Sequence, residues 1–133
     1  MNRMGESQYY IVRGACMACE YGSHKRKLNL PVSHGAFVKD RPMMNEDDYG
    51  PEHISYFGIC GNPDNPSTET IYLVSEEGQQ ISGKPCKPIF PEKWNNTKET
   101  TRVEGKPALT SESYQQCMYM GYVGFMTTGQ EDE

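Results

Sequence analysis

The stretch Gly14-Ala15-Cys16-Met17-Ala18-Cys19-Glu20-Tyr21-Gly22 follows the strand-like run Tyr9-Tyr10-Ile11-Val12-Arg13 and places two cysteines between two glycines. Near the other end, Cys117-Met118-Tyr119-Met120-Gly121-Tyr122-Val123-Gly124-Phe125-Met126 again puts a cysteine a few residues before a glycine, among residues typical of strands. Because glycine tolerates the backbone angles of tight turns, we interpret both stretches as cysteine turns. We therefore expect the two ends of the chain to meet around one site, with the middle of the chain held between them.

The chain has few residues from which to build a hydrophobic core. Ile, Leu, Val and Phe together make up 20 of the 133 residues, which is below the roughly one fifth that separates ordinary globular chains from disorder-prone ones. The nine Tyr, eight Met and five Cys, with a net charge of only -5, do not fit a disordered chain either. We expect one domain over residues 1–133, with its core at about residues 8–128 and a short flexible acidic tail from Gly129. A metal, disulfides or a partner must then help to hold the fold together.

The charge and the apolar pattern of the sequence argue against several classes of protein. With 18 Asp and Glu against 13 Lys and Arg, no basic face is expected for nucleic acid, and we interpret the basic cluster His24-Lys25-Arg26-Lys27 as a solvated loop. The N-terminus lacks the apolar segment of a signal peptide, and no run of about 18 apolar residues occurs. We therefore expect a protein made in the cytoplasm without a membrane-spanning segment. In that reducing compartment cysteines bind metal or stay free more often than they form disulfides.

Short β-rich segments separated by 13 glycines and nine prolines predict an all-β fold of short strands and long turns. No stretch of about ten residues has sustained helical periodicity. The expected strands cover residues 8–13, 28–32, 36–38 and 70–74, a hairpin over 102–109 with Gly105 at its turn, and final strands within 111–126. Pro31 places the second of these at a sheet edge, because proline cannot donate to a ladder.

Four cysteines, Cys19, Cys60, Cys86 and Cys117, each lie beside a turn-forming residue, as a rigid metal knuckle requires. Four thiolates suit tetrahedral zinc, whose binding energy contributes to folding. The wide spacing of these cysteines leaves two alternatives open, namely separate free or buried thiols and disulfides.

Other cysteine and histidine chemistry has less support in the sequence. Cys16-Met17-Ala18-Cys19 has the Cys-x-x-Cys form of redox proteins, but no helical pattern follows it to lower the pKa of a thiol. Cys19 could pair with His34 or His53 as a nucleophile, although such pairs can be drawn in any sequence. The same two histidines could replace or supplement a cysteine ligand; otherwise they are ordinary loop histidines, as we expect for His24.

Four blocks in a fixed order carry a resemblance to a known family. They are Gly14-Ala15-x-Met17-x-Cys19-x-x-Gly22; Asp48-x-x-Pro51-x-x-Ile54-x-x-Phe57-Gly58-x-Cys60 with Asn65-Pro66; Gly83-x-Pro85-Cys86-x-Pro88 with Trp94; and Pro107-Ala108-Leu109-Thr110-x-x-Ser113-x-x-x-Cys117 with Gly129-Gln130. Over about residues 11–130 the chain thereby resembles the PAAR-like spike-tip proteins of contractile injection systems, once described as a domain of unknown function. Cys16 stands outside the four-cysteine pattern and is treated as a reserve ligand. His53 and Tyr122 depart from the asparagine and the glycine pair that are usual in the family.

The resemblance implies a fold and a function. The implied fold is a small PAAR-like β-cone that caps the trimeric VgrG-type spike and sharpens it for membrane puncture, often around a bound metal. We therefore expect a non-enzymatic structural tip of a type VI secretion system or a related injection particle, with structural zinc on the four cysteines and effector or toxin proteins as further partners. The machine would carry such a tip out on firing, so no signal peptide is needed. The alternatives are a free-standing zinc-stabilised β-module that recruits an effector or another protein, and a thiol enzyme or toxin.

Overall fold

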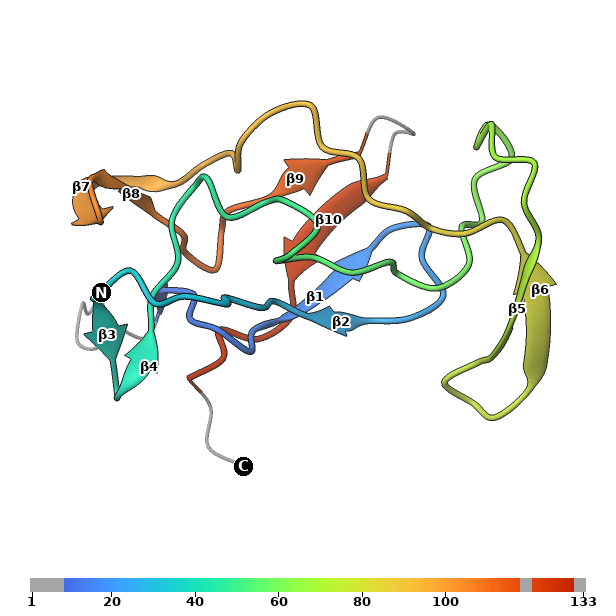
Figure 1. The fold of residues 1–133 in the computed structure, drawn as a ribbon, viewed down its shortest axis with the longest axis horizontal. Helices are drawn as coiled ribbons and strands as arrows, with labels where there is room; N and C mark the ends of the chain where they lie inside the picture. Colours follow the sequence, from blue (N-terminus) through green and yellow to red (C-terminus); the bar gives the residue numbers. More distant parts are fainter. Residues whose placement is uncertain (1–8, 118–120, 131–133) are drawn as a thin grey trace.

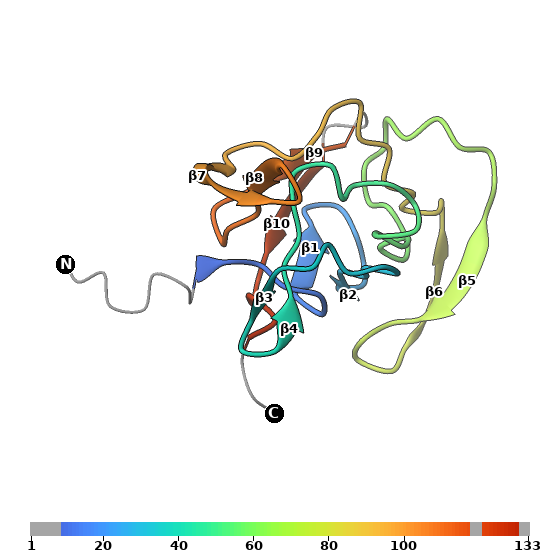
Figure 2. The same cartoon turned by 60° about the vertical axis from the view of Figure 1, so that its left-hand side comes forward.

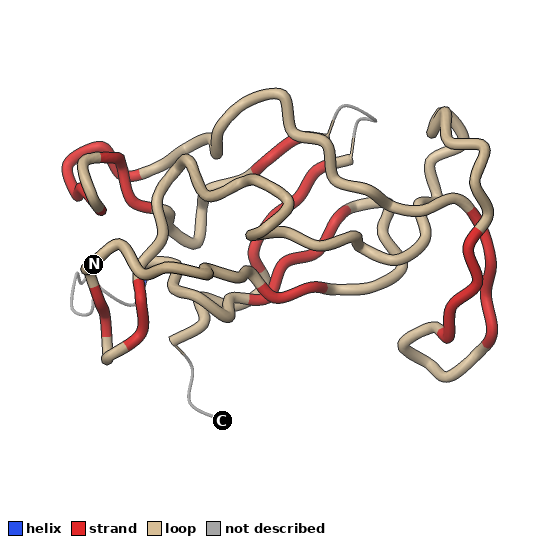
Figure 3. Tube along the Cα trace, in the orientation of Figure 1, coloured by secondary structure: helices blue, strands red, loops and turns tan. Residues whose placement is uncertain are grey.

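The computed structural model describes residues 9–117 and 121–130, and this part of the chain is all-β (Figures 1 and 3). The strands are short and are joined by long irregular segments, as the even spread of glycine and proline predicts. They are β1 (Cys16–Cys19), β2 (Arg26–Lys27), β3 (Phe37–Val38), β4 (Arg41–Pro42), β5 (Ile71–Val74), β6 (Gln80–Gly83), β7 (Lys98–Val103), β8 (Lys106–Ala108), β9 (Gln115–Gln116) and β10 (Tyr122–Phe125). No helix in the described residues is long and apolar enough to cross a membrane.

One four-stranded antiparallel sheet, in the order β2-β1-β10-β9, joins the two ends of the chain. In its centre Cys19 of β1 lies opposite Val123 of β10. The predicted meeting of the two cysteine-glycine stretches is therefore confirmed, except for residues 118–120, which lie outside the described part of the chain.

Three segments that are far apart in the sequence form a closed ring around the fully buried residues Ile11, Met44 and Leu109. The amide of Ile11 donates to the carbonyl of Leu109 (3.0 Å), that of Leu109 to Met44 (3.1 Å), and that of Met44 to Ile11 (3.4 Å). Around this ring, the residue after one centre bridges to the residue before the next. These bridges join Val12 to Met43, Asn45 to Ala108, and Thr110 to Tyr10. Each segment meets the other two in the same way, so this part of the molecule has threefold pseudosymmetry.

Two of the three segments belong to a structural repeat, which covers residues 37–48 and 102–113. Each copy starts with a hairpin of the same register: Val38 pairs with Arg41 in β3–β4, and Val103 pairs with Lys106 in β7–β8. Both connecting turns have positive φ at their two central residues, as in type I′ turns. The φ values are 53° at Lys39, 66° at Asp40, 52° at Glu104 and 84° at Gly105.

Each copy of the repeat ends in the same four-residue turn. The side-chain oxygen of its first residue, Asn45 or Thr110, accepts a hydrogen bond from the amide two residues later, and its carbonyl accepts one from the amide three residues later. The fourth residue, Asp48 or Ser113, accepts the amide of the first through its side chain. These turns fix the backbone with short polar side chains that are largely buried.

The third hairpin, β5–β6, lies at the opposite end of the molecule from β3–β4 and β7–β8 (Figures 1 and 2). The largest fully buried side chain of the described core is Trp94, which is 1% exposed, stacks on Phe125 at 4.9 Å, and donates its indole N–H to the carbonyl of Asp48. None of the described β5–β6 side chains belongs to the buried clusters of the core. This hairpin therefore gains little from core packing.

Several strand predictions need correction. Residues 9–13 form isolated bridges at Tyr10 and Val12, because each pairs with a different neighbour in the ring; Gln8 lies outside the described residues. Residues 28–32 form no strand, since the amide of Asn29 donates to the carbonyl of His53. The segment Cys16–Cys19, interpreted as a turn, is strand β1, and the turn begins at Cys19.

The other expected strands are present. Ile71–Val74 is a strand, Phe37–Val38 covers most of the predicted 36–38, and the hairpin with Gly105 at its turn is confirmed. Gly129 and Gln130, which we assigned to a flexible tail, are buried instead. The side-chain amide of Gln130 donates to the carbonyl of Tyr10, which ties this end to the ring. Residues 131–133 of the predicted acidic tail lie outside the described part of the chain.

Candidate functional site

Four thiols from distant parts of the chain surround one small cavity. Cys19, Cys60, Cys86 and Cys117 line it together with Tyr21, Lys87 and Gly121. Its volume is about 10 Å³, counted as space open to the centre of a water-sized sphere, which is about the room that one water needs. The structure thus brings together all four cysteines that the sequence selected, and all five cysteines of the chain are free thiols.

Turns and short pairings hold the first two sulfurs in place. Cys19 ends β1, and its carbonyl accepts the amide of Gly22 at 3.0 Å to close a tight turn. Cys60 bridges to Gly22, and the neighbouring amide of Gly61 donates to the carbonyl of Tyr21 at 2.8 Å. A Cβ on Gly22 would lie 2.6 Å from the Phe57 side chain, so only glycine fits where these segments cross.

The other two sulfurs are fixed in a similar way. Cys86 lies between Pro85 and Lys87, and its amide donates to the carbonyl of Gly58 at 2.7 Å. The amide of Cys117 donates to the carbonyl of Gly121 at 2.8 Å, so the chain turns back at this cysteine. Three of the four thiol residues are less than a tenth exposed, and Cys60 is half-buried.

The electrostatics of the cluster favour one thiolate. A hydrogen bond from the Cys86 thiol lowers the pKa of Cys19 to about 7 against the opposing effect of burial, helped by the amides of Tyr21 and Gly22. The same bond raises the pKa of Cys86, and burial and the charges of Cys19, Cys60 and Cys117 raise it further. Without a cation, therefore, the cluster cannot hold several thiolates at once, because each opposes ionisation of the next.

A divalent cation of thiolate preference fits the chemistry of this donor set. Zinc bonds to sulfur at about 2.3 Å, which puts tetrahedral sulfurs at roughly 3.8 Å from one another. In the described residues no three His, Cys, Asp or Glu side chains already stand in the geometry of a metal site; Cys19 and Cys86 contact each other instead. Because all four thiols line the same cavity, rotation of the side chains alone would bring the sulfurs closer to a central ion while the backbone stays fixed. The Sγ of Cys60 also accepts the amide of Asn62 at 3.5 Å, the kind of outer contact that orients a metal ligand.

The reserve ligands lie elsewhere. Cys16 and Cys19 are three residues apart in a strand, so their side chains point to opposite faces. Cys16 instead lines a surface cavity with Arg13, Lys27 and Thr127. The two cysteines therefore do not form a redox pair in the described structure.

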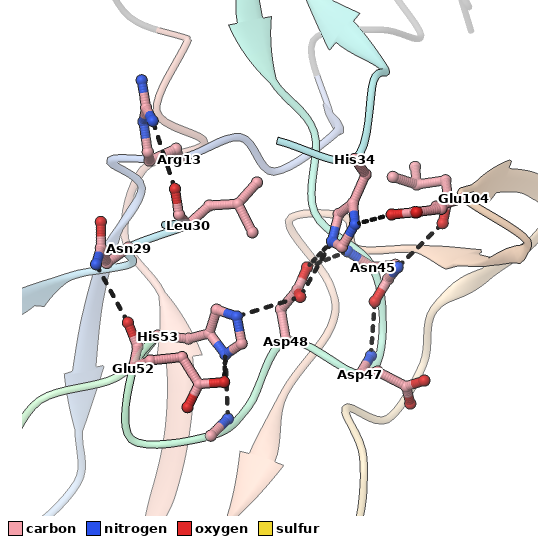
Figure 4. A network of polar contacts seen from close by, with 12 residues as sticks. Arg13, Asn29, Leu30, His34, Asn45, Asp47, Asp48, Glu52, His53 and Glu104 are labelled. Carbon is pink, nitrogen blue, oxygen red and sulfur yellow. Dashed lines mark hydrogen bonds and ion pairs between the residues drawn. The ribbon is translucent and has the colours of Figure 1, made fainter. Parts of the chain in front are cut away.

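His34 and His53 do not line the thiol cavity either. Both rings face the buried carboxylate of Asp48 (Figure 4), with Nε2 of His34 at 2.9 Å and Nε2 of His53 at 3.4 Å from its oxygens. A nucleophilic pair of Cys19 with either histidine, which the sequence does not support, has no support in the geometry either. Nδ1 of His24 is hydrogen-bonded to the Ser23 hydroxyl, and its Nε2 to the carbonyl of Val74 in β5. His24 therefore attaches the hairpin β5–β6 to the segment that precedes β2.

The threefold ring and the Asp48 cluster, by which we mean Asp48, His34, His53 and Glu104, were not predicted from the sequence. The repeat could have been recognised by aligning Phe37-Val38-Lys39-Asp40-Arg41-Pro42 with Arg102-Val103-Glu104-Gly105-Lys106-Pro107, which share Val, a basic residue and Pro at matching positions. Tyr21 and Lys87 in the cavity wall carry no signal of their own, because they are ordinary neighbours of the cysteines.

Comparisons with known proteins add one finding. Residues 11–130 match the family described as a domain of unknown function, DUF4280. Neither the curated proteins nor the solved structures contain a significant match. The match covers nearly the whole chain, including all four thiols of the cavity and all three ring centres. The chain therefore belongs to the DUF4280 family.

Proposed function

We propose that this protein is a non-enzymatic structural tip, which caps the trimeric VgrG-type spike of a contractile injection system and sharpens it for membrane puncture. Zinc on Cys19, Cys60, Cys86 and Cys117 would lock the tip. In this proposal the protein is made in the cytoplasm, sits at the end of the injection apparatus and leaves the cell on firing, alone or with effector or toxin proteins. The resemblance to PAAR-like proteins suggests the role, and the structure supplies independent support.

The observation that carries the proposal is the closed ring around Ile11, Met44 and Leu109. A single chain that caps a trimer must offer similar surfaces in three directions about one axis. The ring supports such an arrangement from within, because each of its three segments bonds to the other two through the same backbone pattern. The two copies of the hairpin and turn extend the pseudosymmetry outward from the ring.

The arrangement of elements suggests which end would face the spike. The hairpins β3–β4 and β7–β8 lie at one end of the long axis, and β1 runs from that side toward the opposite end (Figure 1). The thiol cavity forms where β1 ends and β10 begins. We therefore assign the hairpin end to the spike and the thiol end to the far side of the tip.

Zinc would compensate for the small hydrophobic interior. The larger buried core cluster contains Cys19 and Cys86 among its thirteen residues, so two of the proposed ligands are also part of the core. A metal that binds the folded chain and not the unfolded one stabilises the fold by mass action. When bound, zinc supplies charge neutralisation and tetrahedral cross-linking; the chain supplies the sulfurs, the backbone amides that face them, and burial from water.

One observation favours the alternative of a free-standing module that recruits another protein. In β5–β6, Tyr72 is 71% and Val74 62% exposed on one face, and the hairpin lies at one side of the molecule (Figure 2). An exposed two-stranded hairpin gains stability by docking on a partner. This surface would then be the recruiting one.

The experiment is co-expression with candidate trimeric spikes, followed by native mass spectrometry. The proposal expects one chain per spike trimer. Phe37→Glu in β3, where Phe37 is 53% exposed, should weaken the complex, whereas Tyr72→Glu in β5 should not. Unfolding midpoints of both variants check that each still folds. Three chains per trimer, or binding lost only with Tyr72→Glu, would reject the spike cap and favour the recruiting module.

A further inference from the structure

His34 lies between two carboxylates that come from different copies of the repeat. Its Nε2 is 2.9 Å from Oδ2 of Asp48, and its Nδ1 is 2.5 Å from Oε1 of Glu104 (Figure 4). Asp48 closes the turn of residues 45–48, and Glu104 lies in the β7–β8 turn. The ring of His34 thus connects the loop before β3 to both repeat copies.

The number of protons on the ring decides how many of these contacts can form. A neutral imidazole has one N–H and can donate to one carboxylate, whereas the imidazolium has two and can donate to both. If the ring is neutral, one ring nitrogen faces a carboxylate oxygen with no hydrogen between them. Both contacts are therefore satisfied only in the charged form.

The other charged groups around His34 do not supply a second positive charge or donor to Asp48 and Glu104 in place of the imidazolium proton. His53 approaches Asp48 from the far side at 3.4 Å, and its Nδ1 accepts the amide of Gly50. Glu52 lies 3.7 Å from the His53 ring, and the nearby Lys106 pairs with Asp47 at 3.4 Å. In residues 9–117 and 121–130 no Lys or Arg forms an ion pair with Asp48 or Glu104.

We propose that His34 is a pH-operated clip: protonated, it ties the two repeat copies and the loop of residues 31–35 together, and on losing its proton it releases Glu104. The clip stands on its own contacts and holds whether or not the spike role and the zinc site are correct. The two carboxylates respond differently because Asp48 is 5% exposed and Glu104 is 65% exposed. Water can solvate Glu104 when the contact opens, whereas Asp48 needs the remaining N–H.

The balance of forces places the closed state at pH 6.5 and moderately below it. Burial lowers the pKa of His34, but the hydrogen bonds and charges of Asp48 and Glu104 outweigh it and raise the pKa above its ordinary 6.5. The clip therefore stays closed through pH 6.5 and opens as the pH rises through the higher pKa of the folded protein. Since Glu104 lies in the β7–β8 turn, opening frees this turn from the loop before β3.

The test is an NMR titration of the His34 ring in the full chain, with hydrogen exchange of the amides of residues 33–36. Glu104→Gln removes one partner at an exposed position, and Glu76→Gln, in the turn of β5–β6 at the other end, is a control with the same change in net charge. We expect a His34 midpoint above 6.5 that falls in Glu104→Gln and is unchanged in Glu76→Gln. At pH 6 the amides of Glu104→Gln should exchange about 1.5- to 5-fold faster than those of the parent chain, the range for a partly exposed ion pair. At pH 9 this difference should vanish.

Three results would overturn the proposal that His34 is a pH-operated clip. One is a His34 midpoint at or below 6.5, and another is a midpoint that Glu104→Gln leaves unchanged. The third is an exchange difference of the same size at pH 6 and pH 9, which would mean that Glu104 acts through the backbone of its turn and not through the His34 proton. His34→Gln provides a second check, because it should remove the pH dependence of exchange at residues 33–36.

Discussion

Gly121 closes one side of the thiol cavity, and Gly121→Ala would push a methyl group into the sulfur cluster. The added Cβ would lie 2.9 Å from Sγ of Cys19 and 3.5 Å from the Tyr21 ring. The backbone cannot easily move away, because the carbonyl of Gly121 accepts the amide of Cys117 at 2.8 Å. The sulfur must therefore leave its place. Overpacking of this kind costs about 1–3 kcal/mol, and if the strain falls on the metal site it weakens zinc binding about 5- to 150-fold.

Gly124→Ala is the matched control for this change. It lies three residues further on in β10, and its added Cβ would approach nothing closer than 3.9 Å. Competition with a chromophoric chelator gives the zinc affinity of each variant, and urea unfolding with and without zinc gives the free energy of unfolding. We expect Gly121→Ala to lose affinity and the zinc-dependent part of its stability, while Gly124→Ala keeps both. Equal affinity and equal stability in the two variants would refute the proposed packing of the sulfurs.

Three further predictions concern the ligands, the ring and the clip. Cys86→Ser should abolish stoichiometric zinc binding and lower the unfolding midpoint, whereas Cys16→Ser, on the opposite face of β1, should change neither, as metal analysis and thermal melts would show. Leu109→Ala empties the fully buried centre of the ring and should lower the free energy of unfolding by about 2–5 kcal/mol in urea titrations; a loss below about 1 kcal/mol would mean that the ring is not a packed core. Because the pKa of His34 is raised in the folded state, its contribution to stability is complete below about pH 6.5 and is lost as the pH rises through the folded pKa. The stability difference between the parent chain and His34→Gln should shrink accordingly from pH 6 to pH 9.

The four cysteines could be selected from the sequence because each has a local signal. A glycine or proline lies within four residues of each thiol, and a sulfur held at a turn is a recognisable unit even when its partners are distant. The strand alternation that separates Cys16 from Cys19 is a local signal too. Gly14 and Gly22 on either side of β1 led us to predict a turn in place of this strand. Their turns lie before and after the strand, not within it.

The ring and the Asp48 cluster could not be predicted in the same way. Ile11, Met44 and Leu109 are ordinary apolar residues, and what makes them a ring is that three segments exchange backbone bonds, to which side-chain patterns hardly contribute. Residues 9–13 read as a strand because they are β-rich, yet each of their bridges goes to a different segment. His34 and Glu104 are 70 residues apart, and nothing local to either residue indicates that a turn of the second repeat will bring them together.

In the proposed structure one metal ion holds four distant sulfurs and thereby fixes the fold. The direct measurement is zinc per chain in untagged protein by inductively coupled plasma mass spectrometry, together with unfolding before and after chelation. We predict one zinc per chain, complete loss of zinc in Cys86→Ser, and a large fall in the unfolding midpoint when a chelator removes the metal. A metal content well below one per chain, with an unfolding midpoint that a chelator does not change, would contradict the account.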